Sequence, residues 1–468
     1  MYFLFTLLLL LFTGLPLLLV IFVWLFRRRR ISENNITTVA FFHPYCNAGG
    51  GGERVLWCAI KALQDKSPNI DTIVYTGDIN CLPEDIIKNV KKKFNIDLPR
   101  PVQFVYLKKR NLVEANTYPA FTLLGQSLGS FILGLEAIWA LLPDVYIDTM
   151  GYSFTLPLFK ILGGCYVGCY VHYPTITEEM LQRVSDRIPA HNNSEVVARN
   201  QILTSGKLMY YRIFAWLYAK AGRSADIVMV NSSWTKGHIL NLWNYSSKTY
   251  LVYPPCDVSA LKSLSSDSVT KRKNINIISV GQFRPEKDHP LQLNSLKKLK
   301  EISSSEIWHS VRLIFIGSCR NREDEDRVNN LKEMCKQLEI ENNVEFKVNI
   351  SYEQLKEELK NGTIGLHAMW NEHFGIGVVE CMAAGLIMVA HRSGGPKLDI
   401  VDETEQARTG YLAETDIEYA QAFLKIVQSS EDDLNRIRKA ARLSVDRFSN
   451  DCFEKDFLNA TKYLLPSS

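Results

Sequence analysis

The sequence predicts an α/β protein made of two consecutive doubly wound domains, preceded by one N-terminal membrane helix. Three observations predict this fold class. The chain has 468 residues, which exceeds one comfortable core. Short apolar runs alternate with helical patterns from residue 38 onward, and the alternation restarts after the polar stretch SLSSDSVTKRKN, which is expected to be the interdomain linker.

Residues 1–26 form the first element and carry no charged side chain, so they are long and apolar enough to span a bilayer as a helix. The charges Arg27 to Arg30 follow this stretch instead of preceding it, and no A-x-A cleavage site comes after it. An uncleaved anchor over residues 1–30 is therefore favoured over a cleaved signal peptide. The positive-inside rule then places the rest of the chain in the cytosol.

Strands of the two domains are expected at apolar runs, because parallel strands covered on both faces are apolar almost throughout. The first domain, residues 31–255, and the second, residues 256–440, each contain several such runs. A C-terminal helix over residues 441–468 could pack back on the first domain. In chain order the runs are TTVAFFH, DTIVYTG, PVQFVYL, DVYIDTM, GCYVGCYVHYP, ADIVMVN, TYLVYP, INIISVG, SVRLIFIG, NVEFKVN, TIGLHAM and LIMVAH.

Residues 120–142 are also strongly apolar, but Glu136 and the short length between polar flanks argue against a second membrane span. A buried or membrane-apposed helix is expected there. Apart from the four arginines of the anchor, basic and acidic residues balance at 50 each, which gives no electrostatic reason to expect nucleic-acid binding. The ten scattered cysteines include no CxxC pair, as suits a reducing compartment.

Candidate ligand-binding residues begin in GQFRPEKDHP, residues 281–290, directly after an expected strand. Gly281 permits a tight turn at the carboxyl end of that strand, where open α/β sheets bind ligands. Arg284 and Lys287 are three residues apart and could together hold a diphosphate, the first through directional bonds and the second as a point charge. Two solvated surface cations would explain the same spacing equally well.

A second candidate is NEHFGIGVVECMAAG, where a loop leads into a helix. Gly375 and Gly377 bring backbone N–H groups to the helix N-terminus, which suits an anion. Glu372 lies in the loop, and Glu380 lies inside the helix, where it can accept hydrogen bonds from vicinal hydroxyls as acidic residues do with ribose. A capping Glu372 and a buried, hydrogen-bonded Glu380 are the alternatives. The combination with the upstream cations favours a ligand site.

The E-x7-E pattern with HFGIG inside it, together with the G-x-F-x-x-x-K element GQFRPEK, resembles the retaining, nucleotide-sugar-dependent glycosyltransferases. These have two Rossmann-like domains facing across a cleft, the GT-B type. The resemblance implies that Arg284 and Lys287 contact the donor diphosphate and that Glu380 contacts the ribose. It also implies that no metal is required. The transferred sugar would be held by Glu372 and by the backbone amides of Phe374, Gly375, Ile376 and Gly377.

The first domain carries two further motifs of this family. HPYCNAGGGGERVLW is similar to the Gly-Gly-x-Glu-Arg loop that faces the reaction centre, and here it contains Gly50, Gly51, Gly52 and Glu53. VHYPTIT ends a strand with His172, which the resemblance places near the transferred sugar. The alternative is a histidine at a strand end whose hydrogen bonds are satisfied within the protein.

Asp324-Glu325-Asp326 matches the D-x-D pattern by which other glycosyltransferases bind manganese. These residues lie at the polar start of a predicted helix, where acidic side chains favour the helix dipole. A metal site is therefore not expected.

The full set of motifs, including VYPPCD, GSCRNREDEDRV and HRSGGP, is similar to a eukaryotic family of α-1,2-mannosyltransferases. The resemblance implies a single-pass protein of the endoplasmic-reticulum membrane whose catalytic domains lie in the cytosol. It would use GDP-mannose and add the fourth and fifth mannoses to a dolichol-diphosphate oligosaccharide for protein N-glycosylation. Association with other mannosyltransferases of the pathway would be expected.

Two other functions stay open. The same motifs would serve transfer from UDP-N-acetylglucosamine to phosphatidylinositol, and a membrane-tethered, non-catalytic nucleotide-sugar-binding scaffold is the non-enzymatic alternative. The residue chemistry alone indicates a transferase for a nucleotide-diphosphate sugar beside a membrane.

Overall fold

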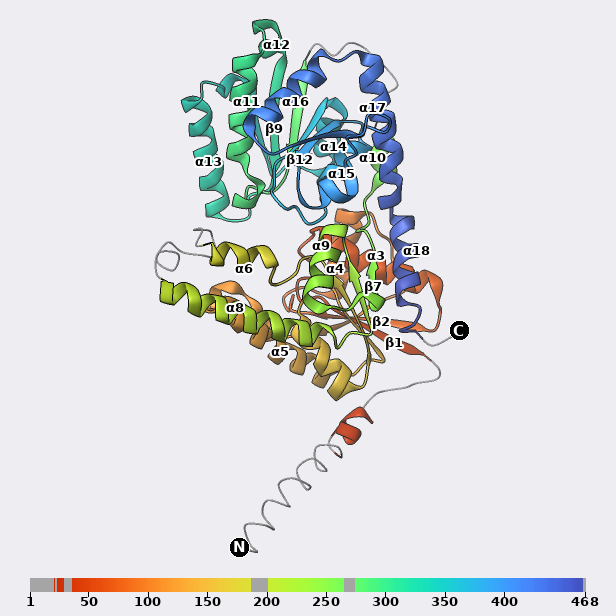
Figure 1. The fold of residues 1–468 in the computed structure, drawn as a ribbon. Coiled ribbons are helices and arrows are strands. Elements are labelled where there is room, and N and C mark those ends of the chain that lie inside the picture. The colour runs from red at the N-terminus through yellow and green to blue at the C-terminus, as the bar shows by residue number, and fades with distance from the viewer. Residues whose placement is uncertain (1–20, 22, 29–35, 187–200, 265–273, 466–468) are drawn as a thin grey trace, which may run out of the picture. The chain divides into compact units, whose positions relative to one another are not determined.

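The computed structural model describes residues 21, 23–28, 36–186, 201–264 and 274–465 (Figure 1). Most of the predicted anchor and most of the predicted linker lie outside these residues. The chain divides into two compact units. The first unit comprises the chain up to Asn231, Thr235–Val252 and Glu454–Ser468, and the second comprises Ser232–Trp234 and Tyr253–Phe453.

The first unit contains a seven-stranded parallel sheet of order β3-β2-β1-β4-β5-β6-β7. In β1, Val39 lies between Thr72 of β2 and Val145 of β4. The chain therefore reverses its direction of strand addition between β1 and β4, as in doubly wound folds. The strands are β1 (Thr37–Phe42), β2 (Ile70–Thr76), β3 (Gln103–Tyr106), β4 (Val145–Asp148), β5 (Tyr166–Val171), β6 (Ile227–Val230) and β7 (Thr249–Leu251).

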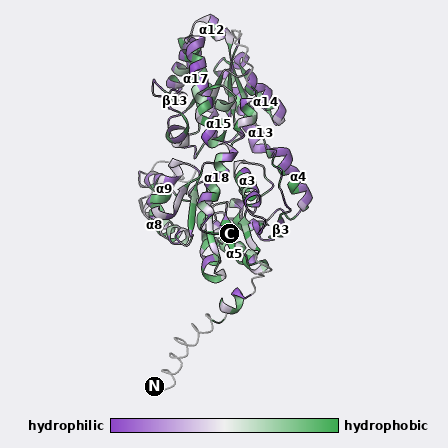
Figure 2. Ribbon diagram, turned by 90° about the vertical axis from the view of Figure 1, so that its right-hand side faces the viewer, coloured by the Kyte–Doolittle hydropathy of each residue, from purple (hydrophilic) through white to green (hydrophobic). Residues whose placement is uncertain are grey.

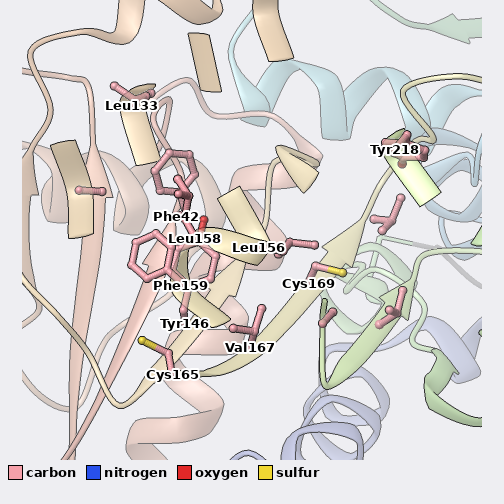
Figure 3. Close-up of a cluster of buried hydrophobic side chains, with 14 of the residues drawn as sticks. Phe42, Leu133, Tyr146, Leu156, Leu158, Phe159, Cys165, Val167, Cys169 and Tyr218 are labelled. Carbon is pink, nitrogen blue, oxygen red and sulfur yellow. The ribbon is translucent and has the colours of Figure 1, made fainter. Parts of the chain in front are cut away.

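The helices of this part of the chain cover both faces of the sheet. One face packs on a large apolar cluster that includes side chains of β1, β4, α5, α8 and α9 but none of α3 or α4. Figure 3 shows part of this cluster, in which the rings of Tyr146 and Phe159 stack at 3.7 Å between centroids. The helices are α3 (Gly51–Lys66), α4 (Pro83–Phe94), α5 (Thr122–Ala140), α6 (Glu178–Ser185), α8 (Gln201–Gly222) and α9 (Ser233–Trp243).

The second unit repeats the plan with a six-stranded parallel sheet of order β10-β9-β8-β11-β12-β13. The strands are β8 (Ile275–Val280), β9 (Val311–Gly317), β10 (Val344–Val348), β11 (Ile364–His367), β12 (Ile387–His391) and β13 (Gly410–Ala413). The helices are α10 (Val258–Lys262), α11 (His289–Ile302), α12 (Ser305–Ser310), α13 (Arg322–Gln337), α14 (Tyr352–Asn361), α15 (Ile376–Ala383), α16 (Asp416–Gln428), α17 (Glu431–Ser444) and the chain-terminal α18 (Asn450–Thr461).

Both sheets confirm the predicted pair of Rossmann-like α/β units. In each sheet the strands are parallel, so the loops that follow them emerge from one edge, and the motifs of the sequence fall in these loops. The predicted helix within residues 120–142 is α5. It is the one helix among the described residues that is long and apolar enough to cross a membrane, although part of it is buried in the first unit.

Candidate functional site

The second unit brings Lys287 and Glu372 together at the carboxyl edge of its sheet. Lys287 ends a short helical turn, Pro285–Lys287, that follows β8, and Glu372 lies in the loop after β11, the neighbour of β8. The Lys287 Nζ lies 2.6 Å from the Glu372 Oε2. His367, the last residue of β11, donates from its Nε2 to the same oxygen at 3.0 Å. Lys287, 85 positions from Glu372 in the chain, and His367, five positions from it, thus bind the same carboxylate oxygen.

These contacts keep Glu372 ionised. Burial alone would raise the pKa of this carboxyl group, because a low-dielectric environment disfavours the charged form. The hydrogen bond from His367 and the positive charge of Lys287 outweigh burial and hold the pKa of Glu372 well below its usual range. A carboxylate that only accepts hydrogen bonds can orient hydroxyl groups, but it cannot act as a general acid.

Arg284 carries donor capacity that its own surroundings do not use. Its Nε is buried and has no hydrogen-bond partner among the described residues. Its Nη1 lies 3.6 Å from the Glu286 carboxylate, a long contact at the surface. A buried guanidinium donor without a partner costs free energy unless an anion binds there. The position of Arg284 therefore fits the predicted anion site better than the alternative of a solvated cation.

The glycine-broken loop ends at α15, and Gly375 lies just before the helix with φ +107°, a conformation that favours glycine. A Cβ on Gly377 would lie 3.8 Å from the carbonyl oxygen of Val280, so the start of α15 approaches the end of β8. Glu380 is the fifth residue of α15 and is half-buried. The N-terminus of this helix, with Gly377 and Ile376 in its first turn, accordingly lies beside the strand that leads to Arg284 and Lys287.

Phe374 contributes differently from its neighbours. Its side chain is buried in the apolar cluster under α15, with its ring 5.7 Å from that of Tyr253 and 5.1 Å from that of Phe448. Only the backbone of Phe374 is therefore available to a ligand, which agrees with the predicted role of its amide. The buried ring fixes the position of the loop.

The loop after β12 holds the Glu372 backbone, and the sequence reasoning missed this contact. Gly395 donates its N–H to the Glu372 carbonyl oxygen at 2.8 Å, and the Ser393 hydroxyl accepts from the Asn371 N–H at 2.7 Å. A Cβ on Gly394, which has φ +59°, would lie 2.2 Å from the same carbonyl oxygen. The sequence Ser393-Gly394-Gly395 directly after a strand could have indicated that another backbone segment approaches closely there.

In the first unit, Glu53 connects the glycine loop to the buried His43 through hydrogen bonds. Glu53 accepts a hydrogen bond from the Gly50 N–H at the start of α3. His43, at the end of β1, is fully buried, and its Nε2 lies 3.2 Å from the Glu53 Oε1. Burial would raise the pKa of Glu53, but the hydrogen bonds from His43 and Gly50 lower it. Since a carboxylate only accepts, Nε2 of His43 donates.

The same chain of hydrogen bonds reaches His172. The Nδ1 of His43 lies 2.8 Å from the Thr149 Oγ1, and the Thr149 carbonyl oxygen accepts from the His172 Nε2 at 3.0 Å. A Cβ on Gly52 would lie 3.5 Å from that Nε2. The structure thus brings the glycine loop and His172 together. His43 and Thr149, which connect them, lie in strand ends that the sequence reasoning did not single out.

The residues of the D-x-D pattern lie at the start of helix α13. Asn321 caps α13 by accepting the Asp324 N–H at 3.0 Å, and the Asp324 carboxylate accepts the Arg320 N–H at 3.0 Å. Across the described parts of the chain, no group of three or more His, Cys, Asp or Glu side chains is arranged to hold a metal ion.

Comparison with known proteins matches each unit to a family model of its own. Residues 36–243 match the model of the ALG11 mannosyltransferase N-terminus, and residues 262–444 match that of the glycosyl transferases group 1. The fold is that of sucrose-phosphate synthase from Thermosynechococcus elongatus, with a TM-score of 0.65 and 15% identity over 92% of this chain and 100% of that chain. It is also that of Anabaena Alr3699/HepE in complex with UDP and glucose, with a TM-score of 0.60 and 13% identity over 91% and 99%.

Curated relatives are far more similar in sequence. The chain is 54% identical over 429 residues to a protein of Mus musculus and 53% identical over 430 residues to one of Homo sapiens, covering 92% of this chain and 87% of each relative. It is 50% identical to one of Xenopus laevis over 94% of this chain and 91% of the relative. All three are named GDP-Man:Man(3)GlcNAc(2)-PP-Dol alpha-1,2-mannosyltransferase, and at this identity and coverage the chain belongs to their family.

Proposed function

We propose that this protein transfers mannose from GDP-mannose, in α-1,2 linkage and with retention, onto the trimannosyl oligosaccharide of a dolichol diphosphate, and then adds a second mannose. The observation that carries the choice of substrates is the name shared by relatives that are at least half identical over nine tenths of the chain. The fourth and fifth mannoses of the oligosaccharide would be the products. Transfer of N-acetylglucosamine from its UDP derivative is not favoured, because the three relatives described above carry the GDP-mannose activity in their names.

The donor diphosphate would bind between Arg284, Lys287 and the N-terminus of α15. The buried, unpartnered Nε of Arg284 supports this placement, because an anion would satisfy it. Lys287 would share its ammonium group between Glu372 and the phosphate, which places the diphosphate within reach of a carboxylate that can accept hydrogen bonds from the mannose hydroxyls. Glu380 would accept hydrogen bonds from the ribose.

In the transfer step, the bond between the mannose C1 and the β-phosphate oxygen breaks, and a bond forms between C1 and the acceptor 2-hydroxyl oxygen on the same face. The hydroxyl proton passes to the departing phosphate oxygen, so the leaving GDP itself acts as the base. A second carboxylate is therefore not needed to form a covalent intermediate. Arg284, Lys287 and the amides of α15 stabilise the charge that develops on GDP. With this charge compensation from the protein, we expect no metal requirement, and activity should persist in excess EDTA.

The first unit would bind the acceptor. Gly50, Gly51 and Gly52 leave the start of α3 without side chains, and His172 lies against Gly52. A backbone surface beside a histidine suits close approach of a sugar ring. The uncharged residues 1–26 followed by Arg27 to Arg30 support attachment to the endoplasmic-reticulum membrane with both units on the cytosolic side.

The test is to incubate the purified full chain with GDP-mannose and a synthetic lipid-diphosphate acceptor that carries the trimannosyl oligosaccharide. The expected products gain one and then two hexoses, and both are released by an α-1,2-specific mannosidase. Turnover with UDP-N-acetylglucosamine and phosphatidylinositol, but not with GDP-mannose, would refute the donor assignment. Unchanged rates in Glu372→Ala and Lys287→Ala would refute the placement of the donor.

A further inference from the structure

The two residues that follow Glu372 each pack against an aromatic ring from a distant part of the chain. The ring of His373 stacks on the ring of Trp234, with 5.3 Å between the centroids and 27° between the planes. The ring of Phe374 lies 5.7 Å from that of Tyr253. Trp234 is buried and His373 is half-buried. Such ring pairs fix the relative positions of the segments that carry them.

Trp234 and Tyr253 lie where the chain passes from one unit to the other. Ser232–Trp234 belong to the second unit, although Trp234 is only the second residue of α9 and the rest of that helix belongs to the first unit. Tyr253 is the residue at which the chain enters the second unit again, within the motif VYPPCD. Both ring contacts are therefore contacts within the second unit.

One buried carboxylate, that of Asp399, joins these two segments. It accepts the Ser233 N–H at 2.9 Å through Oδ2 and the Tyr253 hydroxyl at 2.8 Å through Oδ1. The first N–H groups of a helix have no partner inside it, so a carboxylate at the start of α9 is favourable. Burial, together with the negative charge of Asp399, raises the pKa of Tyr253 to about 12, and its hydroxyl therefore remains a donor. We call Ser233, Trp234, Tyr253 and Asp399 the Asp399 network.

The Asp399 network is continuous with the segment that holds the Glu372 backbone. Asp399 lies four residues after Gly395, whose N–H donates to the Glu372 carbonyl oxygen at 2.8 Å. The backbone of Glu372 is thus held by a hydrogen bond, and the two residues after it are held by the rings of Trp234 and Tyr253. These contacts use backbone and ring atoms, and none of them uses the Glu372 carboxylate.

We propose that Trp234 is a positioning residue for sugar transfer, because its stack on His373 sets where the neighbouring Glu372 carboxylate lies relative to the donor sugar. A misplacement of about 1 Å in such a group can lower the rate up to about a hundredfold. GDP itself, placed on Arg284, Lys287 and the start of α15, should bind almost unchanged. This inference rests on the proposed function, which takes Glu372 as the group that holds the transferred mannose.

The test compares Trp234→Ala and Trp234→Phe in the purified full chain, with GDP-mannose and the lipid-diphosphate trimannosyl acceptor. Trp234→Ala should lower the turnover number at least about tenfold, while the dissociation constant for GDP changes less than about threefold. Trp234→Phe keeps a ring that can stack and should recover most of the turnover. An equal loss of turnover in both variants would overturn the inference.

A double-mutant cycle tests whether Trp234 acts through His373. If it does, His373→Ala should lower the turnover number as Trp234→Ala does, and the double variant should lose no more than the worse of the two. Losses that multiply in the double variant would show that the two residues act independently, and would overturn the proposed route.

The matched control is Trp308→Ala, which removes a tryptophan that also packs on an apolar cluster of the second unit. Trp308 lies in α12, and Figures 1 and 2 show α12 at the opposite end of this unit from α15, which follows the loop of Glu372. Trp308→Ala should lower the thermal stability of the second unit but leave the turnover number at the wild-type value. A loss of turnover equal to that of Trp234→Ala would mean that general destabilisation explains both, and would contradict the inference.

Amide hydrogen exchange of the loop separates this inference from the proposed function, because it needs neither donor nor acceptor. In peptides that contain residues 373–377, exchange should be at least about fivefold faster in Trp234→Ala than in the wild type, and unchanged in Trp308→Ala. A wild-type chain that does not use GDP-mannose would refute the proposed function, and the exchange rates would then decide alone whether Trp234 holds the loop. A wild-type chain that transfers mannose, with unchanged exchange in Trp234→Ala, would refute the inference only.

Discussion

Replacing Lys287 with methionine removes the ammonium partner of Glu372 and keeps the side-chain length. The two groups are 2.6 Å apart, and 25% of the Lys287 and 15% of the Glu372 side chain are exposed. At an effective dielectric of about 20, the Coulomb attraction at this distance is roughly 6 kcal/mol, and desolvation of both groups offsets most of it. Since breaking a fully buried pair costs about 3–5 kcal/mol, and His367 still bonds to the carboxylate, we expect about 2 kcal/mol for this pair.

The measurement is a double-mutant cycle with Lys287→Met, Glu372→Gln and the double variant. Amide hydrogen exchange in peptides that contain β11 reports the opening free energy of the second unit separately from the first. The expected coupling energy is about 2 kcal/mol. The matched control is the exposed pair Lys298–Glu301 on α11, for which Lys298→Met and Glu301→Gln should show no measurable coupling, because water screens both charges.

The pH dependence gives a second check with a fixed sign. The pKa of Glu372 in the folded protein is held below its unfolded value, so its contribution to stability is fully present above the unfolded pKa of about 4.3 and is lost as the pH falls below it. The deficit of Lys287→Met should therefore be constant near neutral pH and shrink in acid. A coupling energy equal to that of the Lys298 control, or a deficit that grows in acid, would refute the electrostatic account.

Three other perturbations have definite expected outcomes. Gly394→Ala should displace the Glu372 backbone, because the added Cβ would clash with the Glu372 carbonyl oxygen and the positive φ is strained for alanine. The turnover number should fall at least about tenfold, while the dissociation constant for GDP should change less. Asp148 is buried with its pKa raised by burial to about 7, so the wild type should lose stability relative to Asp148→Asn as the pH rises from about 4 to 7, measured by thermal unfolding across that range. His43→Ala should leave Glu53 buried without its partner and lower thermal stability, at a cost of about 1–3 kcal/mol, whereas His43→Gln should recover part of this loss.

The sheets could be predicted because buried parallel strands are apolar along their whole length, and this pattern is local in the sequence. The strand that ends at His367 is an example, since TIGLHAM carries it completely. The position of Arg284 and Lys287 after a strand was predictable for the same reason. Their roles toward a donor stay predictions, because no contact within the protein tests them.

Contacts between distant loops were not predictable from one sequence. The ion pair of Lys287 with Glu372 depends on β8 and β11 being neighbours, and the hydrogen bond from Gly395 to the Glu372 carbonyl oxygen depends on β12 lying next to β11. The pairing order of strands decides both, and no local pattern encodes that order. The same holds for His43, which reads as the polar end of an apolar strand but bonds to the glycine loop ten residues later.

The last residues of the chain have a consequence for biosynthesis. Residues 454–465 belong to the first unit, and Leu464 is buried where a Cβ on Gly168 of strand β5 would lie 3.0 Å from its side chain. During translation, the seven strands of the first unit therefore leave the ribosome about two hundred residues before the segment that completes their core. Loss of residues 454–465 by truncation or proteolysis should consequently destabilise the amino-terminal sheet first, and a nascent chain would expose this part of its core until the segment has been synthesised.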